Sequence, residues 1–186
     1  MSLTAPTLLT LLRILMIPVL ALAFYWPAEW ANVLAVIIFV VAALTDWLDG
    51  WVARRFGMTS AFGAFLDPVA DKLMVAVALV LILQRQPEML LALSIAVIIG
   101  REITISALRE WMAGLGEGAR VKVAWTGKLK TILQMVAIGF LLYGEPLGAL
   151  PVLDIGRWLL VIAAVLTIIS MVSYLRAAWP AINSSR

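Results

Sequence analysis

The stretch that decides the fold runs from Trp30 to Arg54 and reads WANVLAVIIFVVAALTDWLDGWVAR. Between Val33 and Leu44 it contains only apolar residues, and its acidic residues follow near the end. A helix rises about 1.5 Å per residue, so roughly 20 apolar residues cross the hydrocarbon core of a bilayer. We therefore predict a membrane-spanning helix from about Trp30 to Ala53, with carboxylates near one face of the membrane.

Five further apolar blocks of similar length indicate five more spanning helices. Hydrophobic residues make up 64% of the 186 residues and charged residues 13%, whereas a soluble domain is about half apolar and about a quarter charged. We predict an all-α polytopic membrane protein with six transmembrane helices, in which residues 1–186 form a single integral-membrane domain. One long polar connection, from Glu110 to Lys130, separates the fifth predicted helix from the fourth. The five blocks run from about Leu8 to Trp26, Ser60 to Leu83, Glu88 to Leu108, Gly127 to Tyr143 and Ile155 to Tyr174.

Pro68 allows two interpretations of the third block. A helix could begin at Pro68 with Asp67 as its cap, but the span would then be shorter than roughly 20 residues. We therefore expect a helix that begins near Thr59 or Ser60 and is kinked at Pro68.

The distribution of basic residues predicts the orientation of the six helices. Lys and Arg stay preferentially on the cytoplasmic side of a membrane. Six spans place twelve of the fourteen basic residues on the side that holds both termini, which is therefore predicted to be cytoplasmic. The twelve are Arg13, Arg54, Arg55, Lys72, Arg101, Arg109, Arg120, Lys122, Lys128, Lys130, Arg176 and Arg186, and the other side receives Arg85 and Arg157.

The composition also excludes several kinds of chemistry. The chain has neither cysteine nor histidine, so disulfides, thiolate metal sites and histidine-dependent nucleophiles are excluded. Carboxylates remain as metal ligands and proton acceptors. The net charge of +3 is explained by topology, so we predict no nucleic-acid partner.

Four carboxylates lie in or beside the second and third apolar blocks. Asp46 and Asp49 are three residues apart and Asp67 and Asp71 are four apart, so each pair lies on one helical face. An ionised carboxylate near hydrocarbon costs several kcal/mol unless it is paired, metal-bound or hydrated. Two such faces opposed would repel without cations, and hard oxygen ligands suit Mg²⁺ or Mn²⁺. The pattern predicts a divalent-metal site.

Small residues accompany these carboxylates. Gly50 and Ala53 lie four residues after Asp46 and Asp49, and Gly63 lies four before Asp67. They leave room for a phosphate ester to approach the metals, and Arg54 offers a fork of donors for its oxygens.

These residues match, position for position, the pattern D-x2-D-G-x2-A-R-x8-G-x3-D-x3-D, and the chain in this respect resembles the CDP-alcohol phosphotransferase family. The resemblance implies six spans and a metal site facing the cytoplasm. It implies that two divalent cations are bound by Asp46, Asp49, Asp67 and Asp71, with Asp71 also as general base. The nucleotide-binding residues that it implies are Asp49, Gly50, Ala53, Arg54 and Gly63. It further implies a homodimer.

Three other segments resemble the bacterial members of this family that make phosphatidylglycerol phosphate: Ala5–Arg13, Arg101–Glu110 and Gly127–Thr131. The resemblance implies transfer of a phosphatidyl group from CDP-diacylglycerol, within the bacterial inner membrane, to glycerol 3-phosphate. Such an acceptor is dianionic. Arg101 and Arg109 are eight residues apart on one helical face, and with Lys128 they could form a clamp for the acceptor phosphate.

Weaker signals and alternatives accompany this interpretation. Ser170 and Tyr174, four residues apart, could reach the same cavity as the clamp. Another acceptor alcohol is the first alternative function, and a cation-coupled transporter is the second, since intramembrane carboxylates also mark ion pathways. A purely structural helical protein is disfavoured by the charges within the apolar blocks.

Overall fold

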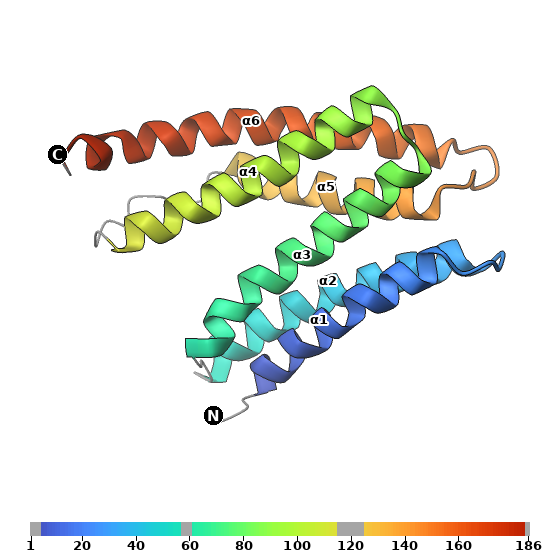
Figure 1. Cartoon of the computed structure of the whole chain (residues 1–186), viewed down its shortest axis with the longest axis horizontal. Coiled ribbons are helices and arrows are strands. Elements are labelled where there is room, and N and C mark those ends of the chain that lie inside the picture. The colour runs from blue at the N-terminus through green and yellow to red at the C-terminus, as the bar shows by residue number, and fades with distance from the viewer. Residues whose placement is uncertain (1–4, 57–60, 115–124, 185–186) are drawn as a thin grey trace. The chain divides into compact units, whose positions relative to one another are not determined.

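The computed structural model describes residues 5–56, 61–114 and 125–184. Every named element of secondary structure in these ranges is an α-helix (Figure 1). This confirms the all-α prediction for the described part of the chain. The helices are α1 (Ala5–Phe24), α2 (Ala31–Phe56), α3 (Ala61–Arg85), α4 (Met89–Gly114), α5 (Trp125–Tyr143) and α6 (Val152–Ser184).

Four of these helices are long and apolar enough to cross a membrane. Their candidate spans are Thr7–Phe24, Ala31–Val52, Met89–Gly114 and Val152–Arg176. In α5 the apolar part is shorter, Leu129–Tyr143. The 25 residues of α3 are interrupted by Asp67, Asp71 and Lys72.

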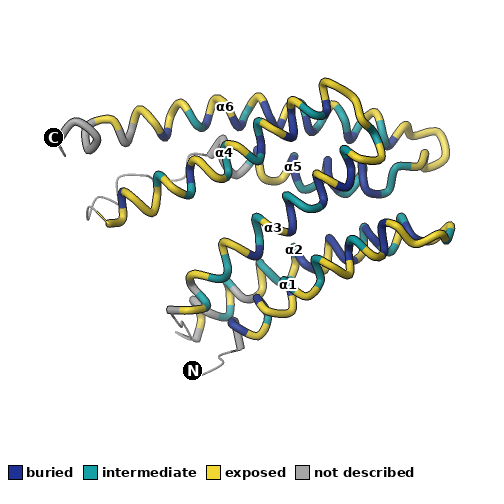
Figure 2. Tube along the Cα trace, viewed as in Figure 1, coloured by how far each residue is buried: buried dark blue, intermediate teal, exposed yellow. Residues whose placement is uncertain are grey.

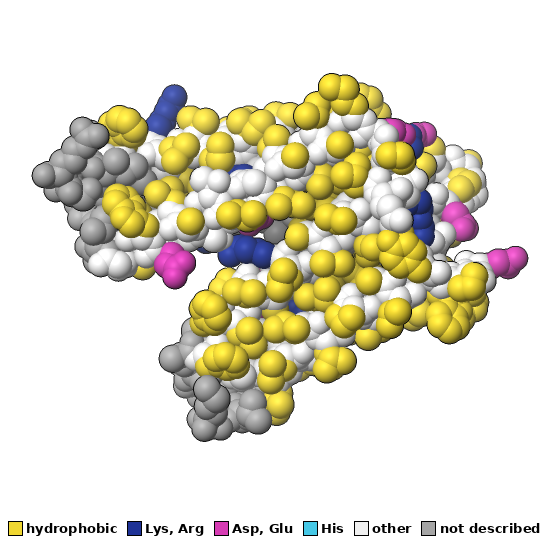
Figure 3. All heavy atoms as spheres, in the orientation of Figure 1, with side chains coloured by type: hydrophobic (Ala, Val, Ile, Leu, Met, Phe, Trp, Pro, Cys, Tyr) yellow, Lys and Arg dark blue, Asp and Glu magenta, His cyan; other side chains and the backbone are white. Residues whose placement is uncertain are grey.

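Large apolar side chains on the outer faces of the helices agree with this assignment. Leu15 of α1, Leu22 of α1 and Ile132 of α5 are 66%, 68% and 61% exposed. Figure 2 shows exposed positions recurring along the helices, and Figure 3 shows hydrophobic side chains spread over the visible face with few charged ones. A helix that faces water turns polar residues outward instead. The chain is therefore an all-α membrane protein.

The first of two compact units comprises Met1–Arg85 and Ile138–Leu153. In this unit α1 packs against α2 and α3, and α2 also contacts α3. Small residues are fully buried at regular spacing, with Ala35 and Ala42 on α2 and Ala70 and Ala78 on α3. Small residues let membrane helices approach closely, which gives the three helices a shared interior.

Arg85 joins the helix ends at one end of this unit. As the last residue of α3 it donates hydrogen bonds to Asn32 Oδ1 at 2.8 Å, to the Phe24 carbonyl at 3.3 Å and to the Leu142 carbonyl at 3.4 Å. Its guanidinium also lies 3.9 Å from the centre of the Phe24 ring. The ends of α1, α3 and α5 therefore meet the start of α2, as a chain that alternates in direction requires.

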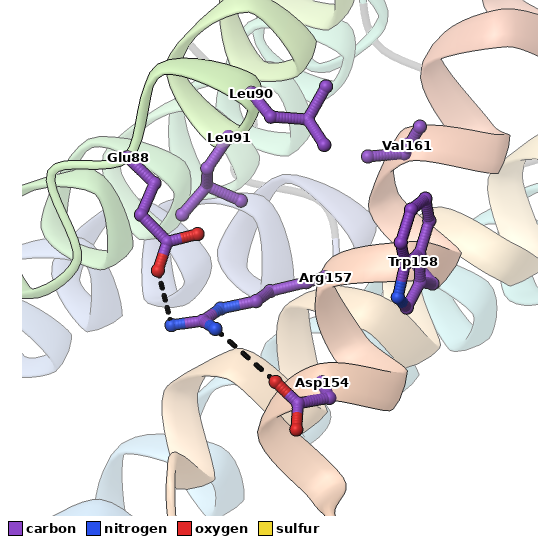
Figure 4. Close-up of a pocket in the computed structure, with 7 residues that line it drawn as sticks. All are labelled: Glu88, Leu90, Leu91, Asp154, Arg157, Trp158 and Val161. Atoms are coloured by element: carbon purple, nitrogen blue, oxygen red, sulfur yellow. Dashed lines mark hydrogen bonds and ion pairs between the residues drawn. The ribbon is translucent and has the colours of Figure 1, made fainter.

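The second unit comprises Gln86–Ala137 and Asp154–Arg186. Figure 4 shows Arg157 of α6 between Glu88, just before α4, and Asp154. The Nη2 atom of Arg157 lies 2.6 Å from Glu88 Oε1, and its Nη1 atom lies 3.3 Å from Asp154 Oδ1. The starts of α4 and α6 therefore meet at the same end of this unit. The pocket in Figure 4 is also lined by Trp158, but its carboxylates are already paired with Arg157. It is a structural junction between two helices.

The polar connection predicted from Glu110 to Lys130 is wrong at both of its ends. Helix α4 continues to Gly114, and α5 already begins at Trp125. The reason in α4 is that Met112 is fully buried, seven residues after the buried Ile105, so the buried face continues past the last strongly apolar run. Helix α6 likewise continues beyond Tyr174 to Ser184.

The third helix begins well before Pro68, as the second interpretation of the sequence predicts. It begins at Ala61, next to the expected Ser60, and contains Pro68 within its length. Asp67 is therefore a residue inside a helix rather than its cap, and it shares a face with Asp71 one turn later.

Candidate active site

Arg13 joins two of the four predicted metal ligands. Its Nη1 atom lies 2.9 Å from Asp46 Oδ1 and 3.1 Å from Asp67 Oδ1. The guanidinium comes from α1 and is 1% exposed, whereas the carboxylates come from α2 and α3 and are 40% and 43% exposed. The structure thus brings carboxylates of two helices together on a buried Arg13, with both carboxylates partly exposed. We call these three residues the carboxylate cluster.

The carboxylate cluster fits part of a divalent-cation site. Its two Oδ1 atoms lie 2.9 Å and 3.1 Å from the same nitrogen, so they are at most 6.0 Å apart. Hard carboxylate oxygens from two helices are the donors that Mg²⁺ and Mn²⁺ take. Within the residues that the structure describes, no three acidic side chains form a group that could hold a metal ion. The side chain of Asp49 lies outside the described residues, and Asp71 is half-buried one turn after Asp67.

The predicted nucleotide-binding residues lie at the adjoining ends of α2 and α3. Gly50 is half-buried in the last turns of α2, and Gly63 is half-buried in the first turn of α3. The side chains of Ala53 and Arg54 lie outside the described residues, although both residues belong to α2. The backbone thus places each member of this group within about two turns of the carboxylate cluster, along α2 for Gly50, Ala53 and Arg54 and along α3 for Gly63.

A second group of charges joins the helices of the other unit. Glu102 of α4 accepts a hydrogen bond from Arg101 Nη1 at 3.1 Å and pairs with Lys130 Nζ of α5. The Lys130 side chain is 4% exposed and that of Arg101 is 10% exposed. The Arg101 Nη2 atom also donates to Ser170 Oγ of α6 at 3.3 Å.

Arg109 meets the same face of α6 two turns further along α4. Its Nη2 atom donates to the hydroxyl of Tyr174 at 3.0 Å. The guanidinium carbons of Arg109 and Arg101 lie 5.3 Å and 5.4 Å from the centre of the Tyr174 ring. Two of the three predicted clamp residues therefore converge on one tyrosine, which is itself 5% exposed. We call Arg101, Glu102, Arg109 and Lys130 the basic cluster.

Of the remaining predictions for this unit, Lys128 belongs to α5, but its side chain lies outside the described residues. The weak signal from Ser170 and Tyr174 identified residues that touch Arg101 and Arg109.

Two buried oxygens add to the polar character of this interior. The side-chain oxygens of Gln134 and Thr167 have no hydrogen-bond partner within the described part of the structure. Gln134 lies one turn after Lys130 on α5, and Thr167 lies one turn before Ser170 on α6. Buried polar atoms without partners are rare in folded proteins.

Sequence reasoning missed two residues that organise these clusters. The sequence predicts Arg13 only as a cytoplasmic basic residue and as the end of the segment Ala5–Arg13, with no place in the site. However, Thr7, Thr10 and Arg13 recur every three residues inside an apolar block and are all buried. That spacing was the available signal. Glu102 had no such signal, because its partner Lys130 is 28 residues away in the sequence.

Replacing Glu102 with Gln should lower the free energy of unfolding by about 3 kcal/mol, because buried Lys130 loses the charge of this carboxylate. Thermal unfolding of the purified protein in detergent measures the effect. Glu88→Gln is the matched control: its side chain is 48% exposed, so its loss should cost less than about 1 kcal/mol. Equal losses in the two variants would contradict the assignment of Glu102 as a buried counter-ion.

The fold and the two clusters define the chain as a helical membrane protein that holds groups of charged side chains between apolar helices. A model of the CDP-alcohol phosphatidyltransferase family matches residues 3–169. The chain is 50% identical over 178 residues to a protein of Escherichia coli (strain K12) named CDP-diacylglycerol--glycerol-3-phosphate 3-phosphatidyltransferase, with 96% of both chains covered. Proteins of the same name from Shigella flexneri serotype 5b (strain 8401) and Salmonella choleraesuis (strain SC-B67) are 50% and 49% identical over the same shares. The chain belongs to the CDP-alcohol phosphatidyltransferase family.

Proposed function

We propose that this chain transfers the phosphatidyl group of CDP-diacylglycerol to glycerol 3-phosphate, giving phosphatidylglycerol phosphate and CMP. The observation that carries the proposal is the identity of about half of all residues, over nearly the whole length, to enzymes named for this reaction. The family match extends from residue 3 to residue 169 and so includes helices of both units. We therefore treat residues 1–186 as one functional domain.

The carboxylate cluster supports the metal part of the proposal. Asp46 and Asp67 supply oxygens from two helices, and Asp49 and Asp71 extend the two faces by one turn. Two divalent cations held there, Mg²⁺ or Mn²⁺, would neutralise charge on the pyrophosphate and on the departing CMP. The backbone positions of Gly50, Ala53, Arg54 and Gly63, at adjoining helix ends, fit the approach of a cytidine nucleotide.

The basic cluster supports an anionic acceptor. Its three cations and one carboxylate leave a net charge of +2 on described side chains that contact one another or share Tyr174. A phosphate monoester that is dianionic neutralises this charge, and a neutral alcohol does not. Arg101, Arg109 and Lys128 are the proposed acceptor-phosphate ligands. The buried oxygens of Gln134 and Thr167 are suited to hydroxyl groups of the acceptor.

The reaction follows from these assignments. Asp71 takes the proton of the free primary hydroxyl of glycerol 3-phosphate. The hydroxyl oxygen forms a bond to the lipid-bearing phosphorus, the bond from that phosphorus to the CMP oxygen breaks, and CMP leaves with the electron pair. Arg54 holds the phosphate oxygens of the nucleotide, and the clamp binds the phosphate of the acceptor.

The membrane arrangement that we propose has six spans, both termini in the cytoplasm and an active site that faces the cytoplasm. In support, Arg85 at the end of α3 contacts the ends of α1 and α5 in one unit. In the other unit, Arg157 near the start of α6 contacts Glu88 just before α4. These two are the basic residues that the positive-inside rule assigns to the outer side. The bacterial relatives support the bacterial inner membrane, and the homodimer that we propose rests on the family resemblance alone.

The product formed from competing alcohols tests this function. The purified protein is incubated with CDP-diacylglycerol, Mg²⁺ and equal concentrations of glycerol 3-phosphate, glycerol and inositol. We expect phosphatidylglycerol phosphate as the main lipid product, identified by mass spectrometry. Equal use of a neutral alcohol would exclude the acceptor assignment, although it would leave the phosphatidyl transfer itself intact.

A further inference from the structure

Arg13 is a buried charge in an otherwise apolar helix. Its side chain is 1% exposed, and it continues a buried stripe on α1 that begins with Thr7 and Thr10, each 2% exposed. A guanidinium within a spanning helix is unfavourable unless opposite charges neutralise it. A charged side chain buried in α1 therefore suggests a role that an apolar side chain at position 13 could not perform.

The contacts of Arg13 point to the carboxylates of the proposed metal site. A single nitrogen, Nη1, contacts Asp46 Oδ1 of α2 and Asp67 Oδ1 of α3. The contact therefore links three helices through two acidic side chains that would otherwise repel each other. Both carboxylates remain about two-fifths exposed despite this contact.

The positive charge of Arg13 lies close to the carboxylates that are proposed to bind the metal ion. Asp46 and Asp67 would hold the cation, and Arg13 Nη1 lies 2.9 Å and 3.1 Å from an oxygen of each. A cation held by these two carboxylates would share them with the fixed positive charge of Arg13. Like charges at this range disfavour each other, so Arg13 weakens the binding of the metal.

We propose that Arg13 is a built-in counter-ion of the metal site, a positioning residue that holds Asp46 and Asp67 together when no cation is bound and lowers their affinity for the cation. This inference rests on the proposed function, in which these two carboxylates bind metal. It extends that function because it gives Arg13 of α1 control over the metal affinity, in addition to the topological role that the sequence predicts for it.

Binding of Mn²⁺ to the purified full-length protein in detergent tests the proposal, with free Mn²⁺ measured by electron paramagnetic resonance. Arg13→Met keeps the length of the side chain and removes its charge. We expect its dissociation constant for Mn²⁺ to fall about tenfold or more. We also expect its melting temperature without metal to fall, and the rise in melting temperature on adding Mn²⁺ to be larger than in the unmodified protein.

Two further variants define the comparison. Arg13→Lys keeps the charge and should bind Mn²⁺ as the unmodified protein does. Arg176→Met removes an exposed basic residue of α6 and should change neither readout, which controls for net charge. Should Arg13→Met fail to fold, Arg13→Gln, which keeps a hydrogen-bond donor, takes its place with the same expected result.

The outcomes separate this inference from the function on which it rests. A folded, uncharged variant that binds Mn²⁺ no more tightly than the unmodified protein would overturn the role of Arg13 and leave the metal site standing. An unmodified protein that binds no Mn²⁺ would overturn the metal site itself. A merely structural Arg13 would lower the melting temperature and leave the dissociation constant unchanged.

Discussion

Replacing Asp46 or Asp67 with Ala should lower the rate of phosphatidyl transfer at least about a thousandfold, equivalent to about 4 kcal/mol of transition-state stabilisation. Each change removes an oxygen ligand from the carboxylate cluster, and with it the charge neutralisation on which a metal-assisted displacement depends. Release of CMP at saturating concentrations of both substrates measures the loss. Chelation of divalent cations should abolish the activity of the unmodified protein, and added Mg²⁺ or Mn²⁺ should restore it.

The variants should remain folded, because Arg13 keeps one of these two carboxylate partners in each. Asp154→Ala is the matched control, since Asp154 is an exposed carboxylate at the start of α6 that pairs with Arg157. It should retain activity. Full turnover by Asp46→Ala or Asp67→Ala would remove both from the set of metal ligands.

Replacing Arg109 or Lys128 with Ala should raise the KM for glycerol 3-phosphate about tenfold or more. Each change removes a charge-assisted contact with a phosphate, worth roughly 1.5 to 3 kcal/mol. The KM for CDP-diacylglycerol should stay nearly constant. Arg54→Ala should show the opposite pattern, because we assign Arg54 to the nucleotide. Steady-state kinetics with each substrate varied in turn separates the two pockets.

Two controls sharpen this prediction. Tyr174→Phe removes only the hydroxyl that receives the hydrogen bond from Arg109 and keeps the ring beneath both guanidiniums, so its effect should be smaller than that of Arg109→Ala. Arg176→Ala should affect neither KM. Equal changes in both KM values for Arg109→Ala would show a general loss of positive charge and would contradict the clamp.

Most of the fold could be predicted from the sequence, because hydrocarbon demands long apolar helices and these leave a strong signal. The expected blocks agree with the observed starts of the helices within a few residues, as at Ala31 and Ala61. The predicted connection from Glu110 to Lys130 is too long at both ends, because polar residues at a helix end do not by themselves mark where the helix stops. A helix can continue through polar residues wherever one face stays buried, as Met112 shows.

The candidate site could be predicted only in part. Spacing reveals which residues share a helical face, and so it grouped Asp46 with Asp49 and Asp67 with Asp71. It does not reveal which faces of different helices meet. The contact of Arg13 with carboxylates on α2 and α3, and that of Glu102 with Lys130 on α5, depend on packing between segments far apart in the sequence.

The central claim is that the acceptor hydroxyl attacks the lipid-bearing phosphorus, and an isotope experiment tests it most directly. The purified protein receives CDP-diacylglycerol, Mg²⁺ and glycerol 3-phosphate that carries heavy oxygen in its free primary hydroxyl. We predict that the heavy oxygen appears in the ester bridge between glycerol and the lipid phosphate of phosphatidylglycerol phosphate, with one unlabelled CMP released for each lipid product. Phosphatidic acid together with a labelled cytidylyl ester of glycerol 3-phosphate would place the attack on the other phosphorus and contradict the account.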